Sequence, residues 1–188
     1  MRRVLLLVLL LLTIAGFTSK VTSAEQAAAD PSTLIAADQF AKWDKEHVRT
    51  TFDILQDDDP RGQNHGKKLN KKVFATPAAE AMDGRKVSIR GYMIPVDLDD
   101  KGVSMFILAP HLDTCCFGTV GQPNQMVLVV MARKTAYARQ DQVTVFGKFH
   151  INDISNAGEF SAQSLYQLDG VAMAVHTAAF EKAVGSRP

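Results

Sequence analysis

Two runs of alternating apolar and polar residues, each interrupted by a single glycine, constrain the fold of this chain more than any other feature. They span Val87–Pro95, with Gly91 in the interior, and Gln142–Ile151, with Gly147 in the interior. An alternation of period two is typical of a β-strand that buries one face. A glycine inside such a strand indicates a bend or a bulge of the sort that closes small barrels. The two runs therefore predict the bent strands of a barrel.

The other strands are predicted from apolar runs bounded by turn residues. Asp99–Gly102 has the composition of a hairpin turn between two of them. Five strands are expected in all: Val87–Ile94, Val103–Leu108, Met126–Met131, Val143–His150 and Ser164–Leu168. Their number favours a mainly β fold, a small five-stranded OB-like barrel, over a β-sandwich, which usually has about seven strands. We assign this β-barrel domain to residues 85–188, with a strand end and a short helix over Val171–Val184.

Residues 25–84 form the predicted N-terminal helical extension of the barrel. From their periodicity and turn residues we expect a helix over Thr33–Glu46, a strand over Val48–Leu55, an exposed loop over Asp57–Lys68 and a short helix over Thr76–Met82. The loop could be interpreted as a calcium loop, but Arg61 and Lys68 occupy positions where that motif needs oxygen ligands. An exposed loop is the better interpretation.

The first residues have the pattern of a secretory signal peptide, which we assign to residues 1–24. Arg2 and Arg3 precede an apolar run over Val4–Leu12, and small residues follow up to Ala24, the predicted cleavage position. The apolar run is shorter than the roughly 20 residues that span a bilayer, so we expect no transmembrane segment after processing. The sequence thus predicts a periplasmic or secreted protein. No cysteine lies near the cleavage position, so a lipoprotein is not expected.

Charge and motifs exclude several classes of function. Removing Arg2, Arg3 and Lys20 with the leader lowers the basic count from 21 to 18 against 20 acidic residues, so the net charge changes from +1 to −2. A near-neutral chain lacks the basic face that nucleic acids require, and we expect no nucleic-acid partner. The sequence has no nucleophile elbow, zinc-protease motif, phosphate loop or Cys-x-x-Cys pair. These features favour a binding protein over an enzyme.

The two cysteines of the chain, Cys115 and Cys116, are adjacent and follow His111 by four residues. They lie in a loop rich in glycine and polar residues between two predicted strands, and such loops often carry function. Three interpretations remain open. The cysteines and His111 are candidate ligands of zinc or copper, with His150 or His176 as a further ligand. The pair could instead form a strained, reducible vicinal disulfide of a thiol/disulfide redox protein. They could also be small buried hydrophobic residues.

Several segments, in order along the chain, resemble a family of exported bacterial proteins that is known only as a domain of unknown function. The matching segments are Phe52–Leu55, Asp83–Val87, Gly91–Pro95, Phe106–Leu108, Thr114–Gly118, Pro123–Gln125, Val145–Gly147 and Ser164–Leu168. Relatives in that family are lipoproteins or periplasmic proteins found near ABC-transporter genes of the macrolide-exporter type, some of them tied to metal supply. This chain differs in lacking a lipoprotein cysteine and in having Cys-Cys-Phe-Gly where many relatives have a Cys…His-Pro form.

The resemblance implies an accessory role in the bacterial envelope. Together with the residue patterns, it predicts an exported periplasmic binding or accessory protein that works with an envelope transporter or another periplasmic protein. Metal handling through the Cys115–Cys116 loop is the chemistry we associate with that role, and a redox protein with a vicinal cysteine pair is the alternative.

Overall fold

The computed structural model describes residues 29–56, 75–112, 124–152 and 164–185. The predicted signal peptide, the Asp57–Lys68 loop and the cysteines Cys115 and Cys116 lie outside the described residues, so the interpretations that rest on them stay predictions.

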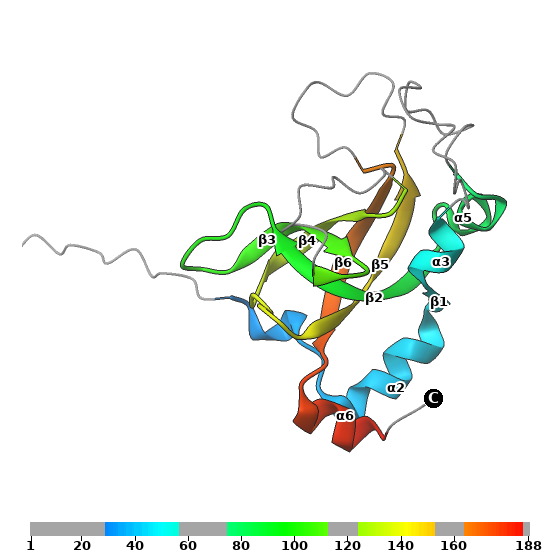
Figure 1. The fold of residues 1–188 in the computed structure, drawn as a ribbon. Coiled ribbons are helices and arrows are strands. Elements are labelled where there is room, and N and C mark those ends of the chain that lie inside the picture. The colour runs from blue at the N-terminus through cyan, green and yellow to red at the C-terminus, as the bar shows by residue number, and fades with distance from the viewer. Residues whose placement is uncertain (1–28, 57–74, 113–123, 153–163, 186–188) are drawn as a thin grey trace, which may run out of the picture.

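Five strands close into a barrel (Figure 1). They are β2 (Lys86–Pro95), β3 (Val103–Ala109), β4 (Val127–Thr135), β5 (Gln142–Ile151) and β6 (Tyr166–Val175). The strand order is β2-β3-β4-β6-β5, and β5 pairs with β2 to complete the circle. All of these pairs are antiparallel except β4 with β6, which is parallel. The prediction of a mainly β, five-stranded OB-like barrel is confirmed.

Strand β2 closes the barrel because it changes partner along its length. Residues 86–92 pair with β5, and residues 92–95 pair with β3, so Tyr92 has a partner on both sides. Gly91 lies where the change occurs. A Cβ atom at Gly91 would lie 2.7 Å from the backbone oxygen of Ala109 and 3.0 Å from the ring of Phe52. The glycine is therefore required by the close approach of β3, which any larger residue would push away.

The barrel core consists of the inward faces predicted from the alternation. Val87, Ile89 and Met93 of β2 are at most 2% exposed. Val143, Val145 and Phe149 of β5 are fully buried as well. Each such side chain contributes roughly 1.5–3 kcal/mol through removal from water. The alternation also leaves Ser88, Arg90 and Thr144 on the outer wall of the barrel, where the site described below is formed.

The N-terminal extension differs from the prediction at two places. It contains a 3-10 turn η1 (Pro31–Thr33) and then α2 (Ala37–Glu46), β1 (Val48–Thr50), α3 (Phe52–Leu55) and α5 (Pro77–Met82). The predicted helix over Thr33–Glu46 begins late because Ile35 donates its backbone N–H to Met173 of β6 at 2.8 Å. The predicted strand over Val48–Leu55 is wrong beyond Thr50. Phe52 and Leu55 are both buried, and a helical turn places residues three apart on one face.

Strand β1 attaches the extension to the barrel. It pairs in parallel with β2 and places Val48 opposite Val87, Arg49 opposite Ser88 and Thr50 opposite Ile89. This is the edge of β2 whose other end pairs with β3. Strand β1 is therefore the sixth strand of the barrel sheet, and it makes the extension continuous with that sheet.

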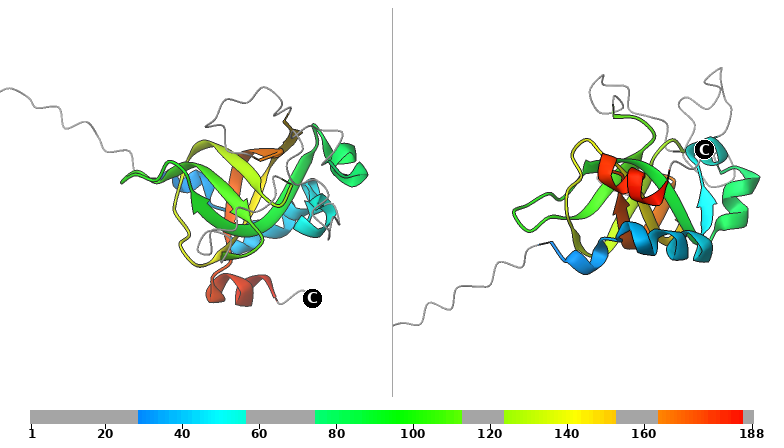
Figure 2. Two further views of the ribbon diagram at one scale, coloured as in Figure 1. Left: turned by 45° about the horizontal axis from the view of Figure 1, so that its top comes forward. Right: turned by 90° about the horizontal axis from the view of Figure 1, so that it is seen from below.

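Two helices cover the outer wall of β5 and β6. Helix α6 (Ala178–Val184) follows β6, and Thr177 caps it by accepting the backbone N–H of Phe180 at 3.2 Å. The right-hand view of Figure 2 shows α2 and α6 side by side against the barrel. Beneath them lies a second apolar cluster, which consists of Ile35, Phe40, Phe146, Ala172 and Ala174, with Trp43, Phe180 and Val184 packed against it. Phe146 points away from the barrel interior but is fully buried under this cover.

Candidate functional site

A cavity of about 420 Å³ lies between the outer wall of the barrel and the elements that cover it. Its floor is formed by Ser88 and Arg90 of β2 and Thr144 of β5. Its walls come from α2, the β1–α3 segment, α6 and the end of β3, and they include the aromatic rings of Phe40 and Phe52. We call this space the side cavity, because it lies outside the barrel interior.

The floor residues are brought together by the pairing of β2 with β5. Arg90 and Thr144 are direct partners in the antiparallel register, and Ser88 lies two residues from Arg90 on the same face of β2. On the other edge of β2, Arg49 of β1 is the partner of Ser88. Three neighbouring strands thus present a polar surface to the cavity.

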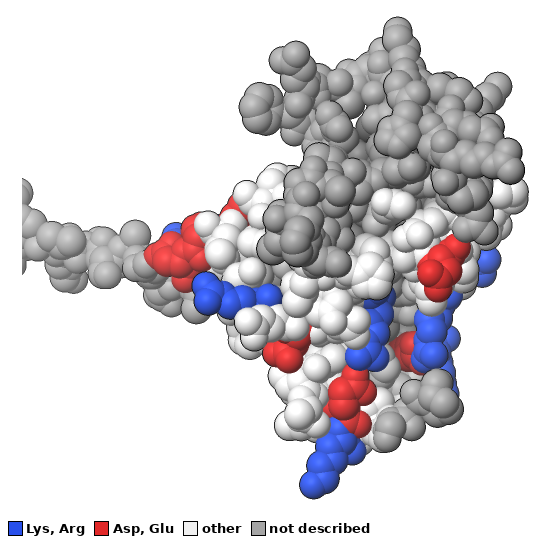
Figure 3. All heavy atoms as spheres, in the orientation of Figure 1, with Lys and Arg blue, Asp and Glu red and all other residues white. Residues whose placement is uncertain are grey.

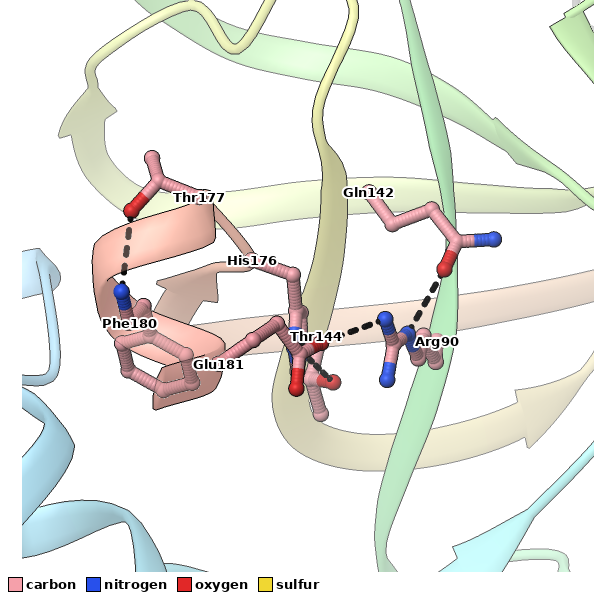
Figure 4. Close-up of polar contacts among 7 residues, drawn as sticks. All are labelled: Arg90, Gln142, Thr144, His176, Thr177, Phe180 and Glu181. Carbon is pink, nitrogen blue, oxygen red and sulfur yellow. Dashed lines mark hydrogen bonds and ion pairs between the residues drawn. The ribbon is translucent and has the colours of Figure 1, made fainter. Parts of the chain in front are cut away.

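Arg90 connects the floor of the cavity to helix α6 (Figure 4). Its Nε donates to Oε1 of Gln142 at 2.8 Å, and its terminal N–H₂ donates to Oε1 of Glu181 at 2.7 Å. The side chains of Arg90 and Glu181 are 47% and 38% exposed. An ion pair this open to solvent contributes little by itself, so we assign it a positioning role.

His176 is the buried centre of the same network. Its Nδ1 donates to Oε1 of Glu181 at 2.8 Å, and its Nε2 lies 2.7 Å from the hydroxyl of Thr144. Only 4% of its side chain is exposed, and the rings of Phe40 and Phe180 pack edge-on against it. Burial, and after it the positive charge of Arg90, lowers the pKa of His176 below its ordinary value, against the opposing effect of Glu181. The neutral imidazole has one acceptor nitrogen, Nε2, which accepts a hydrogen bond from the hydroxyl of Thr144.

Glu181 stays ionised in this arrangement. Burial raises the pKa of its carboxyl group, but the hydrogen bonds from His176 and Arg90 outweigh that effect and hold the pKa below the ordinary value. A carboxylate, a neutral imidazole and a hydroxyl are thus linked in a chain.

This chain has the connectivity of a hydrolase triad, but Thr144 lacks the surroundings of a nucleophile. Strand β5 pairs with β2 on one edge and with β6 on the other, so the backbone N–H groups around Thr144 are used by the sheet. They cannot form the oxyanion hole that acyl transfer requires. Thr144 is also only 5% exposed. We conclude that the network fastens α6 to the barrel and shapes the floor of the side cavity.

Ser88 is the anomaly of the site. The residue as a whole is 2% exposed, and its side-chain hydroxyl has no hydrogen-bond partner. Leaving a buried hydroxyl without a partner costs about 1–3 kcal/mol, and such groups are rare in native proteins. This hydroxyl belongs to a residue that lines the cavity, which points to a ligand.

The charges around the cavity are mixed. Arg49 pairs with Asp44 at 2.7 Å, as Arg90 does with Glu181, and Asp53 adds a third carboxylate to the lining. Basic and acidic side chains also alternate over the face shown in Figure 3, without a large patch of one sign. The site therefore presents arginine donors whose charge is already partly neutralised.

The structure places the described members of the predicted metal site in different surroundings. His111 is exposed and lies at the edge of the side cavity. His176 lines the same cavity, but both of its ring nitrogens have partners. His150 lies elsewhere and pairs with Asp169 at 3.0 Å. Within the described ranges no three His, Cys, Asp or Glu side chains form a metal-binding group, and Cys115 and Cys116 lie outside those ranges. The metal assignment stays a prediction.

Sequence reasoning missed the side cavity itself. The alternation of β2 and β5 did place Ser88, Arg90 and Thr144 on the face opposite the core. It gave no sign that Glu181 and His176, which follow them by more than 30 residues, would cover that face. The burial of outward residues such as Phe146, Ser88 and Thr144 indicates a cover, but it is visible only after the fold is known.

The fold and the side cavity define a single barrel of the OB class with a helical extension on its outer wall. The family described as "Protein of unknown function (DUF3299)" matches residues 22–175, and the chain belongs to this family. The resemblance to a family of unknown function is thereby confirmed.

A crystal structure of a DUF3299 family protein from Pseudomonas aeruginosa PAO1 is similar to this chain, with 17% identity and a TM-score of 0.46. The similarity covers 70% of this chain and 97% of that protein. No curated protein matches this chain significantly. None of the helices in the described ranges is long and apolar enough to cross a bilayer.

Proposed function

We propose that this protein is an exported periplasmic binding or accessory protein whose ligand site is the side cavity. The observation that carries the proposal is the hydroxyl of Ser88, a cavity-lining residue, which is buried without a partner. A ligand that supplies the partner removes a penalty of about 1–3 kcal/mol. The volume of about 420 Å³ also lies in the range of small-molecule sites, which combine apolar walls with a few convergent polar groups.

The envelope location is supported by the residue pattern of the first 24 positions. Arg2, Arg3 and the apolar run over Val4–Leu12 are the features of a cleaved leader. The partner we propose is an envelope transporter of the ABC type or another periplasmic protein, as the resemblance of the motifs implies. A binding protein with a small cavity suits a role that presents a ligand to such a partner.

Intact mass spectrometry of the protein purified from the periplasm tests export and binding together. We expect the denatured mass of a chain that begins at Glu25. We expect the native mass to be higher by that of a small molecule, which denaturation releases. Substitution Arg90→Gln should lower the ligand-bound fraction, because it removes a charged donor from the floor. Arg85→Gln is the matched control, since Arg85 is exposed and is not part of the lining.

Two results would contradict the proposal. A purified chain that still begins at Met1 refutes the cleaved leader. Identical native and denatured masses for wild-type protein, with no ligand bound from periplasmic extract, refute the binding role of the side cavity.

A soft metal site at the edge of the cavity is the second candidate. The observation in its favour is the place of His111, which lies at the cavity edge and precedes Cys115 by four residues. Two thiolates and an imidazole suit Zn(II) or Cu(I), which accept sulfur and nitrogen ligands. In that case Cys115, Cys116 and His111 would hold the ion beside the cavity mouth. The competing chemistry is a reducible vicinal disulfide between the two cysteines.

The double substitution Cys115→Ser and Cys116→Ser separates these candidates. If the loop binds metal, the double variant should fold but lose stoichiometric Zn(II) or Cu(I) and the rise in melting temperature that the metal produces in wild type. If the pair is redox-active, only the oxidised form that resists alkylation should disappear. A variant that keeps metal binding and the wild-type alkylation pattern would refute both candidates.

A further inference from the structure

We infer that the side cavity binds a small organic acid through its single carboxylate group, which accepts hydrogen bonds from Ser88, Arg90 and Arg49. The inference rests on the proposed function, because it assigns the chemical class of the ligand to the cavity proposed there.

The donors lie on one continuous surface. Arg49 is the register partner of Ser88 on the adjacent strand, about 5 Å away across the sheet. Arg90 lies two residues along β2 on the same face, about 7 Å away. The two arginine residues therefore flank Ser88, whose hydroxyl has no partner, on the adjacent strand and along β2. A carboxylate has two oxygens and several acceptor positions, so it can accept from such a group of donors at once.

The two arginines keep donors for a ligand. A guanidinium carries five N–H groups in a planar fork that matches a carboxylate. Arg90 uses two donor atoms in its bonds to Gln142 and Glu181, and Arg49 uses one in its bond to Asp44. The exposed fractions of the two side chains, 47% for Arg90 and 60% for Arg49, allow both to reorient as a ligand reaches the buried hydroxyl.

The acidic residues limit the negative charge of the ligand to that of one carboxylate group. Asp44, Asp53 and Glu181 line the cavity, and two of them already partly neutralise the arginines. A dianion such as phosphate would be repelled by three carboxylates in a partly dehydrated space, whereas a single carboxylate can share the guanidiniums. His176 is neutral and adds no positive charge.

The remaining surface suits the rest of such a molecule. Phe40, Phe52 and Val184 provide apolar lining for a short hydrocarbon group. The hydroxyl of Thr144 donates its hydrogen bond to His176, so toward the cavity it offers only acceptor lone pairs. Asp53 is exposed and can accept from an ammonium group. The lining thus fits the carboxylate of a plain acid and that of an amino acid, and the experiment below distinguishes the two.

The test uses the mature full-length protein and four probes: isocaproate, its amide isocaproamide and leucine, which are similar in size, and inorganic phosphate. We expect isocaproate or leucine to raise the melting temperature and to bind in calorimetry, and isocaproamide and phosphate to do neither. Binding of leucine alone assigns an amino acid, and binding of isocaproate alone assigns a plain acid. Arg90→Gln and Arg49→Gln should each weaken binding about ten-fold, which corresponds to the loss of a charge-assisted hydrogen bond. Arg85→Gln should bind as wild type does.

Several results would overturn the assignment. They are equal binding of isocaproamide, binding of phosphate alone, binding of none of the probes, or wild-type affinity in both cavity variants. Arg49→Gln keeps the test valid if Arg90→Gln unfolds, because Arg49 pairs with Asp44 of α2, whereas Arg90 pairs with Glu181 of α6. A releasable small molecule in the native mass of wild-type protein, together with no carboxylate binding, would refute the ligand class but keep the binding function. Absence of both would refute the two together.

Discussion

Replacing Gly147 with valine is expected to lower the free energy of unfolding by about 3 kcal/mol or more. A Cβ atom at this position would lie 2.3 Å from the backbone oxygen of Asp169 and 2.8 Å from its carbonyl carbon. Because these are backbone atoms of the neighbouring strand β6, a rotamer change cannot relieve the clash. The register of β5 and β6 shifts between Phe146 and Gly147, so the glycine lies at a bulge. The substitution would force the two strands apart where the barrel bends.

Urea unfolding followed by circular dichroism measures this effect. Lys148→Val is the matched control, since it places the same side chain on the next residue of β5 at an exposed position. The control should stay within about 0.5 kcal/mol of wild type. Equal stability of the Gly147→Val variant and the control would show that β6 does not approach β5 as closely as described.

Wild-type protein is expected to lose stability as the pH falls below about 6.5. Burial lowers the pKa of His176 from its ordinary value of 6.5 in the folded state, and the charge of Arg90 adds to the effect. The unfolded chain therefore takes up the proton at a higher pH than the folded protein does. Wherever the unfolded state binds more protons, lowering the pH favours unfolding. The contribution of His176 is complete above pH 6.5 and is lost as the pH falls through the pKa of the folded state.

Glu181 adds a further loss of stability as the pH falls, at a lower pH than His176. Its pKa is held below the ordinary value of 4.5, although burial opposes this, because His176 and Arg90 stabilise the carboxylate. Its contribution is present above pH 4.5 and is lost as the pH falls through its pKa in the folded protein. The two groups belong to one network, so acid should loosen α6 from the barrel.

Unfolding free energies measured from pH 8 to pH 4 for wild type and for His176→Gln test this expectation. The variant should be less stable at pH 8, because it replaces a ring packed between Phe40 and Phe180. It should also lack the decline that begins near pH 6.5, and the decline due to Glu181 should be smaller, because His176 no longer donates to that carboxylate. Parallel pH profiles for the two proteins would rule out His176 as the group responsible.

The barrel could be predicted because its signal is local. The alternation in Val87–Pro95 and Gln142–Ile151 comes from residues two apart, and a strand with one buried face imposes it directly. Gly91 and Gly147 could be recognised as close-approach or bulge sites because a glycine inside a strand is unfavourable without such a reason.

Element ends were predicted less well where a contact distant in sequence overrides the local pattern. The last strand was expected over Ser164–Leu168, with a strand end and a short helix over Val171–Val184. Strand β6 continues to Val175 because it pairs with β5 along that length, as far as Val175 opposite Val143. Phe52 and Leu55 form a helical turn for a similar reason. Their burial against the barrel outweighs the strand propensity of the preceding residues.

The sequence by itself determined the strands, their inward faces and the outward position of Ser88, Arg90 and Thr144, because each follows from a period of two residues. Only the tertiary structure decided what covers that outward face. Arg90 and Glu181 are 91 residues apart, and Ser88 and Arg49 meet through a parallel pairing that no turn specifies. Contacts of this kind depend on the closure of the barrel and on the packing of α2 and α6 over it. Such contacts produce no repeating pattern of residues in the sequence, and the side cavity is formed by them.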